Sequence, residues 1–103
     1  MGEPNPNFQA VLNIIGDWER LDLESALSRL ADDAEFVADP KSNPVCGIDA
    51  IRKLWTYYMQ LFASYDCEVR NSAEQGRLVF VERIERITRR DGLNVVLPVA
   101  TIF

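Results

Sequence analysis

Residues 78–103, LVFVERIERITRRDGLNVVLPVATIF, determine the fold class that the sequence predicts. Two runs rich in β-branched and apolar residues, Leu78 to Arg89 and Leu93 to Phe103, flank the turn at Arg90, Asp91 and Gly92. An Asp-Gly pair between two such runs is a strong signal of a β-hairpin. The last quarter of the chain is therefore predicted to form two antiparallel strands.

The elements before this hairpin are predicted to be mainly helical. Apolar residues that recur at three- and four-residue steps indicate helices with one buried face. Three such stripes run from Phe8 to Trp18, from Leu23 to Leu30 with Asp22 as the cap, and from Gly47 to Phe62. Two strands are also expected, from Ala34 to Ala38 and from Ser64 to Asn71, and a proline-rich loop at 39–44 follows the first of them.

Helices followed by a run of antiparallel strands are typical of α+β proteins. We predict one domain over residues 1–103, in which three N-terminal helices pack on a curved antiparallel sheet, because 103 residues form one core but not two. A strongly bent sheet leaves a conical apolar hollow that suits a small molecule. A domain of this size gains stability from a partner surface, so we also expect a homodimer.

Composition and charge exclude several classes of partner. The chain carries 16 acidic and 11 basic residues, and its net charge of -5 disfavours nucleic acid and anionic membranes. No apolar run reaches the roughly 18 residues of a membrane helix, and the first six residues lack the features of a secretion signal. Cys46 and Cys67 are far apart and match neither a disulfide framework nor a zinc motif. We therefore expect a cytoplasmic protein without a bound metal.

The residue types that are missing narrow the possible chemistry. The sequence contains no histidine, which excludes Ser-His and Cys-His nucleophile pairs and imidazole bases. It has no glycine-rich phosphate loop, so we expect no nucleotide or other cofactor. Any acid-base work then falls to carboxylates.

Arg83 and Glu85 are the first candidates for such chemistry. Alternation along the strand places both on the same face as Val79, Val81 and Ile87. If that face lines the hollow, an ion pair lies among apolar side chains, where pairing can sustain a shifted pKa. The alternative is a salt bridge at the sheet surface or at a dimer contact.

Asp39 is the second candidate, because it directly follows the first predicted strand and would lie at the mouth of the hollow. A carboxylate in that place can abstract a proton from carbon or orient a water molecule. The alternative is an ordinary turn formed with Pro40. The walls of the hollow are expected to come from the first strand, the third helix and the last two strands: Phe36, Ala38, Trp55, Tyr58, Val81, Leu97 and Val99.

Three stretches resemble the limonene-1,2-epoxide hydrolase family, within the SnoaL-like or NTF2-like superfamily. They are WERLDLESALSRLADDAEF at 18–36, NPVCGIDAIRKLW at 43–55 and the hairpin at 78–103. The resemblance implies a cone-shaped dimer that opens an epoxide with water in one step. It also implies that one acid protonates the epoxide oxygen, that a second acid activates a water held by Tyr and Asn, and that an Arg bridges the acids.

Only some of the residues that these roles require are present in this sequence. Arg83 matches the bridging Arg, and Glu85 stands where the resemblance implies the proton-donating Asp. Phe36 and Ala38 stand where the Tyr and Asn that hold water would be. The second acid would lie in a further strand after Phe103. We expect either that a longer chain supplies this last strand of the family, or that the domain lacks it and its activity is impaired or lost.

A second segment, VADPKSNPVCG at 37–47, looks like part of the ketosteroid isomerases. Asp39 would then be the base that shuttles a proton at carbon, although Ile14 and either Val99 or Ala100 stand where the oxyanion donors are expected. Three functions remain open. They are an epoxide hydrolase that uses Arg83 and Glu85 on a small apolar substrate, an isomerase or cyclase that uses Asp39, and a non-catalytic small-molecule-binding or dimerisation domain.

Overall fold

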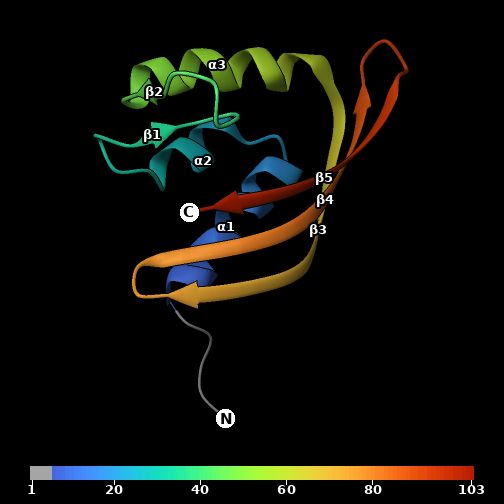
Figure 1. The fold of residues 1–103 in the computed structure, drawn as a ribbon. Coiled ribbons are helices and arrows are strands. Elements are labelled where there is room, and N and C mark those ends of the chain that lie inside the picture. The colour runs from blue at the N-terminus through green and yellow to red at the C-terminus, as the bar shows by residue number, and fades with distance from the viewer. Residues whose placement is uncertain (1–5) are drawn as a thin grey trace.

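The computed structural model describes residues 6–103, and the expectation about a secretion signal concerns a segment that lies almost entirely outside them. Helices and strands follow one another in the order shown in Figure 1. They are α1 (Pro6–Glu19), α2 (Leu23–Ser28), β1 (Glu35–Phe36), β2 (Val45–Cys46), α3 (Ile48–Leu61), β3 (Phe62–Gln75), β4 (Leu78–Arg89) and β5 (Asn94–Ile102).

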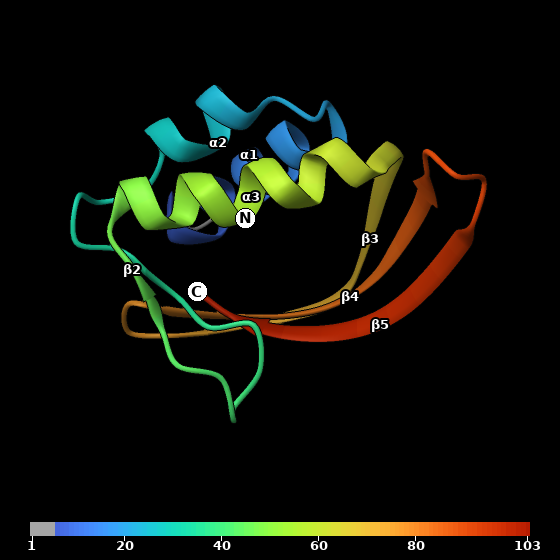
Figure 2. The same ribbon diagram turned by 90° about the horizontal axis from the view of Figure 1, so that it is seen from above.

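The main sheet has the antiparallel order β3-β4-β5, and β1 and β2 form a separate short hairpin. The sheet is strongly curved, and the three helices lie on its concave side (Figure 2). This arrangement confirms the predicted α+β class, with helices packed on a curved antiparallel sheet. The observed β4 has the predicted bounds, Leu78 to Arg89, because turns at Gly76 and Gly92 delimit it on both sides.

Two irregularities of register in β3 accompany the curvature. The pairing of β3 with β4 shifts between Phe62 and Ser64 and again between Val69 and Asn71. Such bulges bend a strand and increase its local twist. The second shift lies opposite Arg83, because Val69 pairs with Arg83 and Asn71 with Glu82. The sheet therefore departs from regular pairing beside the predicted ion pair.

The elements around α3 differ from the sequence-based expectation. β3 extends from Phe62 to Gln75, because its polar second half, which lacks an apolar pattern, pairs with the start of β4. β1 has two residues in place of the expected Ala34 to Ala38, and it pairs with β2, which was not predicted. Both strands are too short to show an alternating pattern. α2 ends at Ser28, before the expected Leu30.

The core consists of two clusters under the helices. Val11 and Ile15 of α1 pack on Val79 and Val81 of β4. The second cluster joins α2 and α3 and contains Ala26, Leu27, Ile51 and Trp55. The apolar stripes predicted for the helices therefore face the sheet and one another. Among the helices of residues 6–103, none has the length and hydropathy needed to span a bilayer.

Asp17 connects α1 with the end of α2. Its side chain is fully buried and accepts hydrogen bonds from Arg20 Nη2 at 2.5 Å and from Arg29 Nε at the C-cap of α2. A buried carboxylate needs such partners because it has lost its contact with water. The pair of guanidinium groups thus fixes the angle at which α2 leaves α1.

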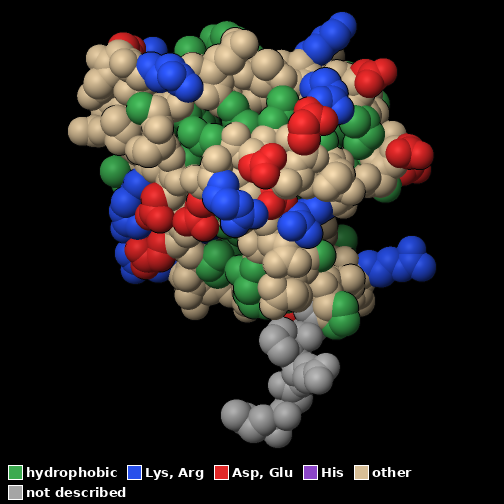
Figure 3. Space-filling view, turned by 180° about the vertical axis from the view of Figure 1, so that it is seen from behind, with side chains coloured by type: hydrophobic (Ala, Val, Ile, Leu, Met, Phe, Trp, Pro, Cys, Tyr) green, Lys and Arg blue, Asp and Glu red, His purple; other side chains and the backbone are tan. Residues whose placement is uncertain are grey.

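The convex face of the sheet carries an apolar stripe along β4 and β5. Val96 and Ile102 are 62% and 64% exposed, and paired positions extend the stripe to Phe80, Ile84, Pro98 and Ala100. Charges of both signs adjoin it, because Arg86 forms salt bridges with Asp66 and Glu68 on the same face. A rim of both signs can complement a second copy of itself. The opposite side of the molecule, seen from behind in Figure 3, likewise carries interspersed acidic and basic side chains.

We therefore expect the convex face to be the contact of the predicted homodimer. Val96→Lys should weaken self-association at least tenfold, because a lysine in the stripe would have to lose its hydration in the interface. Light scattering after size-exclusion chromatography measures the change. Leu93→Lys, at an exposed position in the β4–β5 turn, is the matched control. Dimers of unchanged affinity in Val96→Lys would assign the contact to another face.

Candidate functional site

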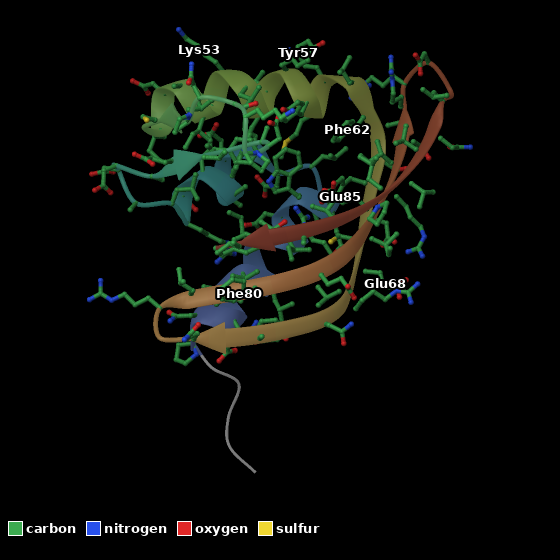
Figure 4. The ribbon with its side chains drawn as sticks, viewed as in Figure 1. Lys53, Tyr57, Phe62, Glu68, Phe80 and Glu85 are labelled. Carbon is green, nitrogen blue, oxygen red and sulfur yellow. The ribbon has the colours of Figure 1, made fainter. Side chains whose placement is uncertain are left out.

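Arg83 and Glu85 lie on the concave face of β4, below the helices. Their side chains are 14% and 17% exposed, and Arg83 Nη1 lies 3.2 Å from Glu85 Oε2. Figure 4 shows Glu85 on the inner side of the strands, whereas Glu68 points outward from the opposite side. Val79, Val81 and Ile87 on the same face of β4 are buried, and Arg89 ends the row. The structure thus places a partly enclosed ion pair among mainly apolar neighbours on the concave face.

Tyr65 of β3 completes this pair and was missed by the sequence analysis. Its hydroxyl donates a hydrogen bond to Glu85 Oε2 and accepts one from Arg83 Nη1 at 2.9 Å. Arg83 Nε also donates to Thr101 Oγ1 of β5 at 3.2 Å. The sequence did place this tyrosine in a predicted strand, Ser64 to Asn71. Its position beside Glu85, however, depends on the register between β3 and β4, which the sequence pattern does not give. Three strands therefore contribute to one polar cluster.

Burial sets the protonation of two neighbours of the pair. Desolvation raises the pKa of the Tyr65 hydroxyl well above its ordinary value, and the hydrogen bond to Glu85 raises that pKa further. Tyr65 therefore remains a neutral donor throughout the physiological range. Burial likewise raises the pKa of the Cys67 thiol, whose sulfur lies 3.7 Å from Arg83 Nη1. A protonated thiol is a poor nucleophile, so Cys67 is a neutral neighbour in this site.

Aromatic rings hold Tyr65 in place. Trp18 of α1 packs against Tyr65 with ring centroids 5.7 Å apart, and Phe62 stacks on Tyr65 at 6.1 Å with an angle of 13° between the planes. Trp18 also meets Trp55 of α3 edge-on at 5.1 Å. These contacts cover one side of the polar cluster with apolar surface. The Tyr65 hydroxyl is therefore fixed in position.

The residues predicted to line the hollow divide into two groups. Phe36, Trp55 and Tyr58 pack in the core between β1, α2 and α3, where Trp55 is 5% exposed and its ring meets that of Phe36 at 5.7 Å. Val81 is buried under α1, and Ala38 lies on the exposed loop after β1. Leu97 and Val99 of β5 pair directly with Glu85 and Arg83. Among the seven predicted positions, these last two are the cross-strand partners of the ion pair.

Asp39 lies in an exposed turn between β1 and β2. Its carboxylate accepts hydrogen bonds from the Lys41 backbone N–H at 2.8 Å and from the Ser42 hydroxyl at 2.7 Å. The hydrogen bond from Ser42, followed by that from Lys41, lowers the pKa of Asp39 below its ordinary value. A weaker base in a self-contained turn favours the structural alternative. The catalytic role of Asp39 stays a prediction.

Two shallow open depressions lie along the sheet. The larger, of about 420 Å³, is lined by residues near the second bulge, including Asn71, Ile84 and Pro98. The other, of about 360 Å³, is lined by residues that include Phe80, Ala100 and Ile102. Arg83 borders the larger depression, neither depression includes Glu85, and most of the remaining lining residues lie on the convex face. Both hollows thus accompany the proposed dimer face.

The polar cluster has one carboxyl oxygen to spare. Tyr65 and Arg83 both donate hydrogen bonds to Glu85 Oε2, and no hydrogen bond to Oε1 is found among the described residues. Oε1 is thus the oxygen that can give a proton to a bound molecule or take one from it. Within residues 6–103, no three His, Cys, Asp or Glu side chains are grouped closely enough to ligate a metal.

The raised pKa of Tyr65 predicts a dependence of stability on pH. The unfolded phenol ionises near its ordinary pKa of 10.0, whereas the folded one keeps its proton to higher pH. The free energy of unfolding should therefore fall as pH rises above that value. Tyr65→Phe should reduce this fall, as measured by urea unfolding between about pH 9 and about pH 11. Equal slopes in the two proteins would contradict the burial of the hydroxyl.

Comparisons with known proteins identify the fold and the family. The structure resembles an NTF2-like protein of unknown function from Burkholderia pseudomallei, with a TM-score of 0.82, 19% identity and coverage of 96% of this chain and 80% of the other. It also resembles an LEH-like epoxide hydrolase from M. tuberculosis, with a TM-score of 0.78, 18% identity and coverage of 94% of this chain and 71% of the other. A third similar structure is a putative SnoaL-like polyketide cyclase from Shewanella putrefaciens, with a TM-score of 0.83, 16% identity and coverage of 97% of this chain and 79% of the other.

At these identities the similarity shows the fold alone. No protein of curated function matches the sequence significantly. The family model of the SnoaL-like domain matches residues 11–103, which include every residue of the polar cluster. The chain therefore belongs to the SnoaL-like domain family.

Proposed function

We propose that this chain opens small apolar epoxides with water, with Glu85 as the proton donor and Arg83 as the group that holds it. The observation that supports this proposal is the inward-facing Arg83-Glu85 pair, whose carboxyl leaves Oε1 free. The fold, shared with proteins that include an LEH-like epoxide hydrolase, is compatible with this chemistry. The substrate class follows from the surroundings, since Leu97 and Val99 flank the pair.

The contacts of Glu85 suit an acid that becomes an anion. To act as the acid, Glu85 first takes up a proton on Oε1 from solvent, and Oε1–H then donates to the epoxide oxygen while Oε2 keeps its hydrogen bonds from Tyr65 and Arg83. As the epoxide C–O bond breaks, the proton moves to the leaving oxygen, water forms the new C–O bond, and the proton that water loses restores Glu85 through solvent. Donors already aimed at Oε2 stabilise the charge that develops on the carboxyl.

The rate should be modest, because the side chains at the predicted water-binding positions cannot hold water. Phe36 is part of the core, and Ala38 is an exposed alanine. Water would then be oriented only by its contact with the substrate and the carboxyl. Positioned acid-base groups contribute about 10² to 10⁴ each to a rate, and this site supplies one of them.

A second candidate function is non-catalytic binding of a small molecule by the same concave face. It is favoured by the hydrogen bonds of the cluster, which join Arg83 and Glu85 to Tyr65, Cys67 and Thr101 but to no second carboxylate among the described residues. A ligand with one donor or acceptor oxygen could bind to Oε1 without reacting. The homodimer and the cytoplasmic location stay predictions for either function.

Hydrolysis of an epoxide panel in heavy-oxygen water tests the proposal. The wild-type chain should form diols that carry the label, and Glu85→Gln should lower the rate at least about 100-fold, because it removes the proton donor. Glu68→Gln is the matched control, since Glu68 lies on the convex face and is 43% exposed. Unchanged turnover in Glu85→Gln would exclude the assigned role.

The same panel separates the two candidate functions. Saturable quenching of tryptophan fluorescence by the epoxides, without labelled diol, would favour non-catalytic binding. Trp18 is suited to report it, because its ring contacts Tyr65 at 5.7 Å.

A further inference from the structure

We infer that Tyr65 is the positioning residue of Glu85, and that its hydroxyl determines which carboxyl oxygen faces the bound molecule. This inference deepens the proposed function and rests on it, because its kinetic test measures the rate of epoxide opening. Tyr65 does not correspond to the water-holding tyrosine that the family resemblance implies, since Phe36 occupies that place. It comes instead from the neighbouring strand β3, where it pairs with Ile87, two residues along β4 from Glu85.

The three polar groups form a closed triangle. Arg83 Nη1 lies 2.9 Å from the Tyr65 oxygen and 3.2 Å from Glu85 Oε2, and the Tyr65 hydroxyl donates to that same Oε2. The hydroxyl therefore accepts from the cation and donates to the carboxyl at once. Hydrogen bonds to charged groups are stronger than neutral ones, and Oε2 receives two of them.

The hydroxyl, and not the ring, carries this role. The ring of Tyr65 is held by Trp18 and Phe62, and the residue is 6% exposed. A phenylalanine would fill the same space and keep both aromatic contacts. What it would lose is a donor fixed in position before any ligand binds, and such fixed donors are effective because they need no reorganisation.

Removal of the hydroxyl frees Glu85 to turn toward Arg83. A guanidinium group binds a carboxylate most strongly when two parallel N–H groups meet both oxygens. With Tyr65 in place, both donors meet Oε2 and Oε1 is left over. Without the hydroxyl, the two-oxygen geometry would engage Oε1 as well. The proton donor would then be withdrawn from the substrate, although the substrate could still bind.

The test compares Tyr65→Phe with Tyr57→Phe, the same chemical change on the outer side of α3, where Tyr57 is 58% exposed and points away from the sheet (Figure 4). Tyr65→Phe should lower kcat by about 10- to 100-fold, the value of one hydrogen bond to a charged group, with KM within about twofold. Tyr57→Phe should leave both constants unchanged. An unaltered kcat in Tyr65→Phe would overturn the inference.

A second readout does not require turnover. In proton NMR of the intact protein, the Tyr65 hydroxyl should give a downfield, slowly exchanging resonance, because the proton is buried and bonded to a carboxyl group. The signal should vanish in Tyr65→Phe and shift upfield in Glu85→Ala, and it should persist in Tyr57→Phe. Its absence from the wild type would overturn the role of Tyr65. Its presence without any diol formation would count against the proposed function alone.

Discussion

A pair of opposite charges turned inward from the middle of β4 is the constraint on which the site depends. Arg83 and Glu85 have largely left water, and the loss of hydration must be offset by contacts within the protein. Their mutual contact is one such interaction, and Tyr65 and Thr101 supply others from the neighbouring strands. The concave face therefore requires one specific set of partners around β4.

The rest of the fold provides these partners. The bulge between Val69 and Asn71 shifts the register of β3 directly beside Arg83. Below it, α1 covers Val79 and Val81, and Trp18 from the same helix packs on Tyr65. Apolar packing thus seals one part of the concave face and leaves the polar cluster at the boundary of the packed region. A carboxyl with one free oxygen at such a boundary is suited to meet a small molecule.

Much of the architecture could be predicted from local patterns, whereas the composition of the site could not. Alternation along β4 is sufficient to place Arg83 and Glu85 on one face. The partner Tyr65 depends on the pairing of β3 with β4, which residue patterns within β3 do not specify. Phe36, Trp55 and Tyr58, which were predicted to line the hollow, pack in the core, and an apolar side chain that lines a hollow has the same sequence pattern as one that fills a core. β2 was not predicted, because a strand of two residues shows no periodic pattern of apolar and polar residues.

The most direct measurement of the central claim is the coupling free energy between Arg83 and Glu85. It is obtained from urea unfolding of Arg83→Met, Glu85→Gln and the double variant, beside the same cycle for Arg86→Met and Glu68→Gln on the convex face. The inward pair should couple by at least about 1.5 kcal/mol, because it is partly enclosed and shares Tyr65. The exposed pair, with atoms 3.0 Å apart, should couple by about 0.5 kcal/mol. Equal couplings would show that solvent screens Arg83 and Glu85 as fully as a surface pair, and would contradict an enclosed site.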